Sequence, residues 1–312
     1  MIEPRRAIVT VGNFDGVHRG HRALLAAARE RAQALNADVV ALTFTEHPAR
    51  VLRPSHAPKP LMTTGERAAA LMQAGADRIE WLKPSPEILQ LSPANFVDYV
   101  QQRVDVAGWL EGPDFRFGKG RAGDVDTLRE LGEANNFDVE VIEPIDVVLT
   151  DRTIVPVRSS LVRWLVEMGR VTDAALCLGQ PLSIRGTVQA GEKRGRQIGF
   201  PTANLDTGDR LLPADGVYGG LTTIDKQTYP VAVSVGTKPT FAGGDRAFEA
   251  YILDFEGDLY GRSMGVELVR WVRQQYTFPN VDALVAQMHR DVNRIRRWHK
   301  RGFLSLKPHA AA

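Results

Sequence analysis

Near its N-terminus the chain reads Val11-Gly12-Asn13-Phe14-Asp15-Gly16-Val17-His18-Arg19-Gly20-His21. An apolar run typical of a buried strand precedes this stretch, and an Ala- and Leu-rich run typical of an amphipathic helix follows it. Its glycines therefore lie in a strand-to-helix turn, where they let the backbone approach a ligand closely. A helix N-terminus offers N–H groups and a positive dipole end, which suit a phosphate. His18 and His21 are three residues apart, so they share a helix face and can donate to the same phosphate oxygens.

Length and composition narrow the class of protein. The chain has 312 residues, which suggests about two domains. Hydrophobic residues make up 44% and charged residues 24%, a globular balance, and the net charge of +2 is too mild to indicate nucleic-acid binding. The single cysteine, Cys177, excludes an intramolecular disulfide and a cysteine-rich zinc site. With no signal-type segment and no membrane-spanning run, we expect a cytoplasmic protein that binds neither nucleic acid nor membrane; a transient homo-oligomer stays open.

The first half alternates strand and helix patterns. Strands are expected at Ala7–Val11, Asp38–Phe44, Arg78–Leu82, Val106–Glu111 and Asp138–Ile142. Helices are expected at His21–Leu35, Gly65–Ala74, Ala94–Arg103 and Thr127–Asn135. This alternation is typical of an α/β, doubly wound parallel sheet of the Rossmann-like kind. Because ligands bind beyond the carboxyl ends of such strands, the opening motif, Thr43-Phe44 and Gly112–Gly118 are expected to converge on one crevice.

The pattern changes after a helical stretch, Ser159–Leu178, and a break at Gly179-Gln180-Pro181. Five strands joined by Gly-, Pro- and Asp-rich turns are expected, at Leu182–Val188, Gly216–Ile224, Tyr229–Val235, Phe248–Phe255 and Met264–Val272. They favour an antiparallel β-barrel, followed by a terminal helix at Val281–Lys300. We therefore expect two domains, residues 1–180 and 181–312.

A His-x-x-His pair alone is weak evidence for a catalytic site, because a histidine near a helix start is more often a cap or a surface residue. The full string is more specific: it resembles the His-x-Gly-His signature of the nucleotidylyltransferase superfamily. In its longer form, Gly-Asn-Phe-Asp-Gly-Val-His-x-Gly-His, it is similar to the prokaryotic bifunctional riboflavin kinase/FAD synthetases. The resemblance implies that His18 and His21 are catalytic. It also implies ATP contacts at four residues of the turn, Gly12, Asn13, Phe14 and Gly20.

A second segment, Val157-Arg158-Ser159-Ser160-Leu161-Val162-Arg163, resembles the family's Ser-Ser-Thr-x-Ile-Arg string. Paired serines at a helix start can cap the helix or bind phosphate. The resemblance implies that Ser159 and Ser160 contact ATP and that Arg163 is catalytic. Arg158 stands where a serine is usual, and we hypothesise that it contacts a phosphate instead.

The segment Gly112-Pro113-Asp114-Phe115-Arg116-Phe117-Gly118 resembles the family's Gly-x-Asn/Asp-Phe-x-Phe-Gly motif. Asp114 can hold a ligand hydroxyl or ring nitrogen, and Phe115 and Phe117 can stack on a planar ring. The plainer interpretation is two core aromatic residues around a turn. The resemblance implies that these three residues bind flavin.

In the second half, a basic, glycine-rich loop, Gly191–Gly199, runs into Phe200-Pro201-Thr202-Ala203-Asn204, which resembles the Gly-Phe-Pro-Thr-Ala-Asn signature of riboflavin kinases. Thr202 and Asn204 offer oxygen ligands two residues apart, a set suited to Mg²⁺ beside phosphate. The alternative is a solvated basic hairpin. The expected ATP and phosphate contacts of this loop are Gly191, Lys193, Arg194, Gly199, Pro201 and Thr202.

Two further residues complete the predicted kinase site. Glu249 lies on a predicted strand and matches the family's presumed base, which would accept the proton of the riboflavin 5′-hydroxyl. Arg273 matches an arginine near the family's presumed flavin site. The terminal helix is rich in arginine, and we interpret it as a solvated face behind an apolar stripe of Leu284, Met288, Val292 and Ile295.

The resemblance covers nearly the whole chain and implies an enzyme with two activities. The C-terminal module would make FMN from riboflavin and ATP, and the N-terminal module would convert FMN and ATP to FAD and pyrophosphate. Its ligands would be riboflavin, FMN, FAD and ATP or ADP, with Mg²⁺ in both steps. Two alternatives stay open: a riboflavin kinase whose adenylyltransferase module is impaired by the altered Val157–Arg163 segment, and a non-catalytic flavin-binding regulator.

Overall fold

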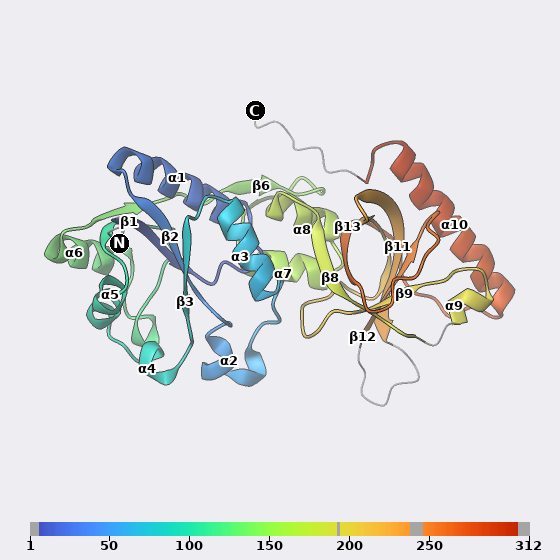
Figure 1. Ribbon diagram of the computed structural model, residues 1–312, viewed down its shortest axis with the longest axis horizontal. Helices are drawn as coiled ribbons and strands as arrows, with labels where there is room; N and C mark the ends of the chain where they lie inside the picture. Colours follow the sequence, from blue (N-terminus) through green and yellow to red (C-terminus); the bar gives the residue numbers. More distant parts are fainter. Residues whose placement is uncertain (1–5, 192–193, 238–245, 305–312) are drawn as a thin grey trace. The chain divides into compact units, whose positions relative to one another are not determined.

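The computed structural model describes residues 6–191, 194–237 and 246–304, which belong to two compact units (Figure 1). The first unit takes in the chain up to Val147 together with Ile154–Ser159. The second takes in Val148–Thr153 and the chain from Ser160 onward. Among the helices of the described ranges, none has the length and apolar composition needed to cross a bilayer.

The first unit is built on a five-stranded parallel sheet in the order β3-β2-β1-β4-β5. Its strands are β1 (Ala7–Gly12), β2 (Asp38–Phe44), β3 (Arg78–Leu82), β4 (Val106–Glu111) and β5 (Asp138–Val141). All five lie where the apolar runs predicted them, which confirms the doubly wound sheet. The chain moves outward from β1 in one direction and returns to β4 on the other side, so the point of reversal lies between these two strands.

Helices cover both faces of this sheet. α1 (Arg19–Leu35) and α3 (Thr64–Gln73) pack on one face, and α5 (Pro93–Gln101) and α6 (Val125–Asn135) on the other. Local sequence fixes their starts: the Ser92 hydroxyl accepts a hydrogen bond from the Asn95 N–H and caps α5. The connections carry four short helices, α2 (Ala49–Leu52), η1 (Pro54–His56), α4 (Pro86–Leu89) and η2 (Lys119–Arg121).

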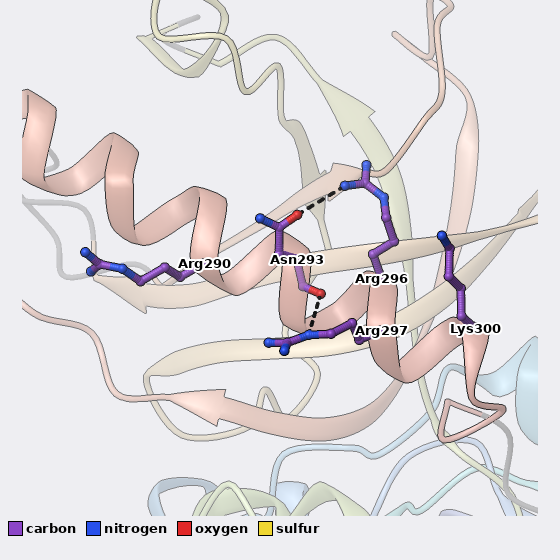
Figure 2. Close-up of a pocket in the computed structure, with 5 residues that line it drawn as sticks. All are labelled: Arg290, Asn293, Arg296, Arg297 and Lys300. Carbon is purple, nitrogen blue, oxygen red and sulfur yellow. Dashed lines mark hydrogen bonds between the residues drawn. The ribbon is translucent and has the colours of Figure 1, made fainter.

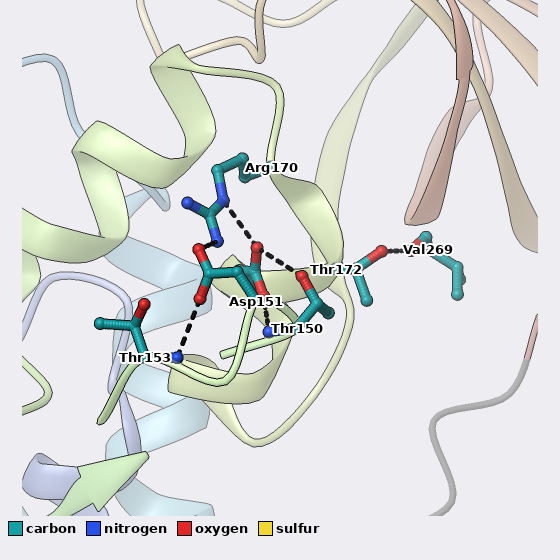
Figure 3. A network of polar contacts seen from close by, with 7 residues as sticks. Thr150, Asp151, Thr153, Arg170, Thr172 and Val269 are labelled. Carbon is teal, nitrogen blue, oxygen red and sulfur yellow. Dashed lines mark hydrogen bonds and ion pairs between the residues drawn. The ribbon is translucent and has the colours of Figure 1, made fainter. Parts of the chain in front are cut away.

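A two-stranded sheet of β6 (Asp146–Val148) and β7 (Ile154–Pro156) follows β5. The turn between these strands is held by a polar network (Figure 3). The buried Asp173 carboxylate accepts hydrogen bonds from the Thr150 N–H at 2.7 Å and from Arg170 Nε at 2.7 Å. Arg170 also pairs with Asp151 at 2.7 Å. These contacts explain why the turn belongs to the second unit.

The stretch predicted as one helix, Ser159–Leu178, is two helices, α7 (Ser159–Glu167) and α8 (Val171–Leu178). The break falls at Gly169, which has a φ of 72°. A left-handed glycine ends an α-helix, although the apolar periodicity runs through it. In the structure, the first compact unit ends at Ser159 and the second continues from Ser160, at the start of α7. The boundary predicted at residue 180 separates the two expected activities rather than these two compact units, and it stays a prediction.

The second unit contains a closed barrel in the strand order β10-β11-β12-β9-β8-β13, with antiparallel neighbours. Its strands are β8 (Leu182–Gln189), β9 (Ala203–Asp206), β10 (Gly216–Ile224), β11 (Gln227–Thr237), β12 (Arg246–Ile252) and β13 (Ser263–Arg273). The predicted barrel is confirmed, with β9 as a sixth strand that was not expected. The short α9 (Arg194–Gln197) precedes β9, and α10 (Val281–Lys300) packs on the barrel through the buried Val292 and Ile295.

Candidate active sites

The two histidines of the opening motif lie together at the start of α1. His18 is the N-cap, and its Nδ1 accepts a hydrogen bond from the His21 N–H at 3.3 Å. The two rings stack with their centroids 3.6 Å apart and an interplanar angle of 16°. Because Nδ1 of His18 acts as an acceptor, the proton of the neutral ring lies on Nε2, which is then the donor atom. The predicted pairing of the two histidines on one face is thus present.

The backbone of the preceding turn is strained. Phe14, Gly16 and Val17 have φ values of 45°, 90° and 39°. A positive φ is rare for a bulky or β-branched residue, and each such residue costs on the order of 1–3 kcal/mol. Phe14 and Val17 are buried, so packing holds the turn in this conformation. Strain of this kind concentrates at ligand-binding turns.

Two buried charged side chains support the turn from outside the motif. The Asp15 carboxylate accepts hydrogen bonds from the backbone N–H groups of Leu61, at 3.0 and 3.1 Å to its two oxygens, and Met62, at 3.3 Å. Arg67, which is 7% exposed, donates to the carbonyl oxygens of Asn13 at 2.9 Å and Phe44 at 2.6 Å. Burial lowers the pKa of Arg67, while the charge of Asp15 acts in the opposite sense. Sequence reasoning missed this support.

Three distant segments meet at the turn. The Ser159 hydroxyl donates to the Asp15 carbonyl at 3.0 Å, across 144 residues of sequence. Arg158 forms an ion pair with Asp114, with 2.7 Å between guanidinium nitrogen and carboxylate oxygen. A Cβ at Gly20 would lie 3.2 Å from the His18 ring, so a larger residue there would press the ring out of its place by a few tenths of an ångström. The opening motif was expected to converge with Thr43-Phe44 and 112–118. The Thr43 hydroxyl donates to the Asn13 carbonyl at 3.3 Å, and Arg158, next to Ser159, joins Asp114 to the turn. The part played by 157–159 in this convergence was not expected.

The predicted ligand contacts of this unit fall into different environments. Oδ1 of Asn13 is buried and has no hydrogen-bond partner among the described residues, whereas most buried polar atoms have one. Phe115 is half-buried and stacks on Phe117, with 5.3 Å between centroids. Phe117 itself is buried and packs against Phe96, so its own face is already covered. The flavin role predicted for this aromatic pair stays a prediction.

The remaining predicted contacts of this site lie partly in the second unit. Ser160 and Arg163 lie on α7 within the second unit. Their roles at the histidine turn, like those of Gly12, Phe14 and Ser159 toward ATP, stay predictions.

In the barrel, Asn204 of β9 stands opposite Glu249 of β12 in the antiparallel register. Directly opposed residues share one face of the sheet, with Cβ atoms about 4.5–5.5 Å apart. A Cβ at Gly191 would collide with the side-chain amide of Asn204, and Thr202 lies two residues before it. The structure therefore brings Gly191, Asn204 and Glu249 together, and Thr202 lies just before β9 in the sequence. Their oxygen donors suit Mg²⁺, which takes few protein ligands when phosphate and water supply the rest.

The loop that carries the kinase signature is anchored by Phe200. Its N–H donates to the Gly195 carbonyl at 2.8 Å, and its ring contacts Tyr251 and His289 edge-on. Pro201 follows directly and is exposed, and Gly199 takes a φ of 85° that glycine accommodates. Lys193 lies outside the described residues, and Arg194 opens α9.

Arg273 makes a contact that the sequence did not indicate. Its Nε lies 2.7 Å from a carboxylate oxygen of Asp291 on α10, and both side chains are largely buried. Its guanidinium also lies 5.6 Å from the centroid of Phe278. This pair joins the end of β13 to α10, and the predicted flavin contact of Arg273 stays a prediction.

The outer face of α10 is basic (Figure 2). A shallow hollow of about 450 Å³ is lined by one asparagine and four cationic side chains, Arg290, Asn293, Arg296, Arg297 and Lys300. Asn293 accepts hydrogen bonds from Arg296 and Arg297, and Arg296 also pairs with Asp254 at 2.7 Å. This side of α10 is therefore basic and faces solvent. Of the predicted stripe beneath it, Val292 and Ile295 are buried and Met288 packs beside them.

The fold defines a two-part protein: a Rossmann-like parallel sheet, of a class that binds nucleotides beyond the carboxyl ends of its strands, and a closed antiparallel barrel. The FAD synthetase family model matches residues 1–154, and the riboflavin kinase model matches residues 178–299.

Relatives match along nearly the whole chain. A bifunctional riboflavin kinase/FMN adenylyltransferase from Pseudomonas fluorescens is 37% identical over 93% of this chain and 92% of its own. One from Escherichia coli is 34% identical over 91% and 90%. A crystal structure described as a macrolide-efflux protein from Streptococcus pneumoniae is 31% identical, covers 95% of both chains and has a TM-score of 0.86. The chain belongs to the bifunctional riboflavin kinase/FMN adenylyltransferase family.

Proposed function

We propose that this chain carries out both reactions of its family: ATP-dependent phosphorylation of riboflavin to FMN in the barrel, and adenylylation of FMN to FAD in the first unit. Its substrates and products would include riboflavin, FMN, FAD, ATP and ADP. We also propose that both reactions take place in the cytoplasm.

In adenylyl transfer, a phosphate oxygen of FMN attacks the α-phosphorus of ATP, and the bond to the β-phosphate oxygen breaks to release pyrophosphate. His18 and His21 would donate hydrogen bonds to the oxygens on which charge develops, and Arg163 would add a positive charge. Gly12, Gly20 and the start of α1 would hold the triphosphate. One such donor is worth roughly 10²–10³ in rate.

In the kinase reaction, the 5′-hydroxyl of riboflavin attacks the γ-phosphorus of ATP and ADP leaves. Glu249 would accept the hydroxyl proton. Thr202 and Asn204 would hold Mg²⁺, which when bound neutralises charge on the triphosphate. Because Mg²⁺ usually keeps several waters and takes few protein ligands, ATP phosphates and water would supply the rest of its coordination.

One observation carries the assignment for the first unit. Segments 144 residues apart meet at the strained histidine turn, through Ser159 and the Asp15 carbonyl. Strained turns held in place by the surrounding structure cluster at ligand-binding sites, which supports the assignment.

The test uses two single substitutions and both activities. His21→Ala should lower FAD formation from FMN by roughly 10²–10³ and leave FMN formation from riboflavin unchanged. Glu249→Gln should lower FMN formation from riboflavin and leave FAD formation from FMN unchanged. A His21→Ala protein that forms FAD at the wild-type rate contradicts the assignment.

A further inference from the structure

Glu111, the last residue of β4, is a buried acid that none of the steps above uses. It is 3% exposed. Its Oε1 accepts two hydrogen bonds, from the Val11 N–H at 2.6 Å and from the Trp109 indole Nε1–H at 2.9 Å. Val11 and Glu111 are 100 residues apart in the sequence, so this contact joins two strand ends.

The carboxyl group replaces a backbone bond of the sheet. The paired register of β1 and β4 runs from Ala7–Val106 to Val9–Trp109 and stops there. Alternate N–H groups of a strand point to the same neighbour. The Ala7 N–H donates toward β4, to the Asp105 carbonyl at 2.7 Å. The Val11 N–H points the same way, and there it meets the Glu111 side chain.

This bridge lies at the reversal point of the sheet. The strand order places β1 and β4 side by side where the chain changes direction, and ligands of such sheets bind beyond this point. Val11 directly precedes the turn that begins at Gly12, and Glu111 directly precedes the segment that begins at Gly112. One carboxyl group therefore ties the starts of the two segments proposed to hold ATP and FMN.

We propose that Glu111 is a positioning residue for adenylyl transfer, which fixes the histidine turn relative to the 112–118 segment. The proposal rests on the adenylyltransferase function proposed above. Two N–H groups converge on Oε1, so this position requires a hydrogen-bond acceptor. Either the neutral or the ionised carboxyl group can supply it. Burial raises the pKa of Glu111 well above its ordinary value, which favours the neutral acid.

The chain offers a conservative and a disruptive variant. Glu111→Gln keeps an acceptor oxygen of the same reach. Glu111→Leu removes the acceptor and leaves two buried N–H groups unsatisfied. The riboflavin kinase activity of the same preparation reports that the second unit is folded and intact. Leu128→Ala serves as the control for general destabilisation of the first unit. Leu128 lies on α6 and belongs to the same core cluster as Val11 and Trp109, the two partners of Glu111.

The measurement is kcat and KM for FAD formation from FMN and ATP, beside kcat for FMN formation from riboflavin. Glu111→Gln should stay within about twofold of the wild type in both reactions. Glu111→Leu should lose roughly 10- to 100-fold in kcat for FAD formation, because an error of about 1 Å in position can cost 10²-fold. Its kinase rate, and both rates of Leu128→Ala at a temperature where that variant is folded, should be unchanged.

Three results overturn the proposal: a wild-type kcat for Glu111→Leu, an equal loss in Leu128→Ala, or an equal loss in Glu111→Gln. If the wild-type protein itself makes no FAD from FMN, the adenylyltransferase function fails first. That failure is visible before any substitution is compared.

Discussion

Arg158 stands in the proposed adenylyltransferase site at a position where the resembled family usually has a serine. Its guanidinium pairs with Asp114, and the two side chains are 56% and 69% exposed. An exposed ion pair contributes only about 0–1 kcal/mol to stability. Arg158→Ala should therefore leave the thermal unfolding of the protein nearly unchanged.

Its effect on activity should be much larger. We hypothesise that Arg158 contacts a substrate phosphate, and a hydrogen bond to a charged group is worth about 1.5–3 kcal/mol. That loss corresponds to a roughly 10- to 150-fold fall in kcat/KM, since about 1.4 kcal/mol is a factor of ten. Because the pair with Asp114 places Arg158 at the segment proposed for FMN, we expect the fall in kcat/KM for FMN rather than for ATP.

The assay measures FAD formation with FMN and ATP varied separately, and FMN formation from riboflavin on the same preparation. Arg116→Ala is the matched control, because Arg116 is an exposed arginine of the 112–118 segment that donates to the Phe115 carbonyl. The control should behave as the wild type. A wild-type kcat/KM for FMN in Arg158→Ala, or equal losses in the two variants, would refute the reasoning.

Further predictions concern the other sites. Gly191→Ala should lower riboflavin kinase activity at least tenfold while FAD formation from FMN continues, because the added Cβ collides with the Asn204 amide; equal kinase rates would contradict the placement of Asn204. Asp173→Ala should lower the free energy of unfolding of the second unit by about 2–3 kcal/mol, since it removes a buried acceptor of Thr150 and Arg170; urea unfolding tests this, and a loss below about 0.5 kcal/mol would contradict it. Glu111→Gln should change how stability depends on pH. The native pKa of Glu111 is raised above its ordinary 4.5, so the native state holds this proton more tightly than the unfolded state. As the pH rises above 4.5, wild-type stability should therefore fall relative to the variant by up to about 1.4 kcal/mol per pH unit until the native pKa is reached. Parallel urea-unfolding results from pH 5 to 8 would show that Glu111 is ionised in the native protein.

The sheet and the terminal helix could be predicted because their signals are local. The apolar runs give the five parallel strands within a residue or two at each end, and α10 begins and ends where its pattern does. The opening motif also gave the histidine turn, since strand, glycines and helix follow one another in sequence. Local periodicity is sufficient for elements of this kind.

Other features depend on contacts that no local pattern contains. β9 is only four residues long and begins inside Phe-Pro-Thr-Ala-Asn, which has the composition of a turn. The supporting roles of Asp15, Arg67 and Glu111 come from partners tens to a hundred residues away. A buried charge in a sequence is indistinguishable from an exposed one until the fold supplies its donors and acceptors.

The most direct test of the whole account follows the products of one purified protein over time. The protein is incubated with ATP and Mg²⁺ and either riboflavin or FMN, and the flavins are separated by chromatography. We predict FMN and then FAD in the first reaction, and FAD in the second. FMN alone from riboflavin, with no FAD from FMN, would contradict the adenylyltransferase assignment, and no product in either reaction would contradict both activities.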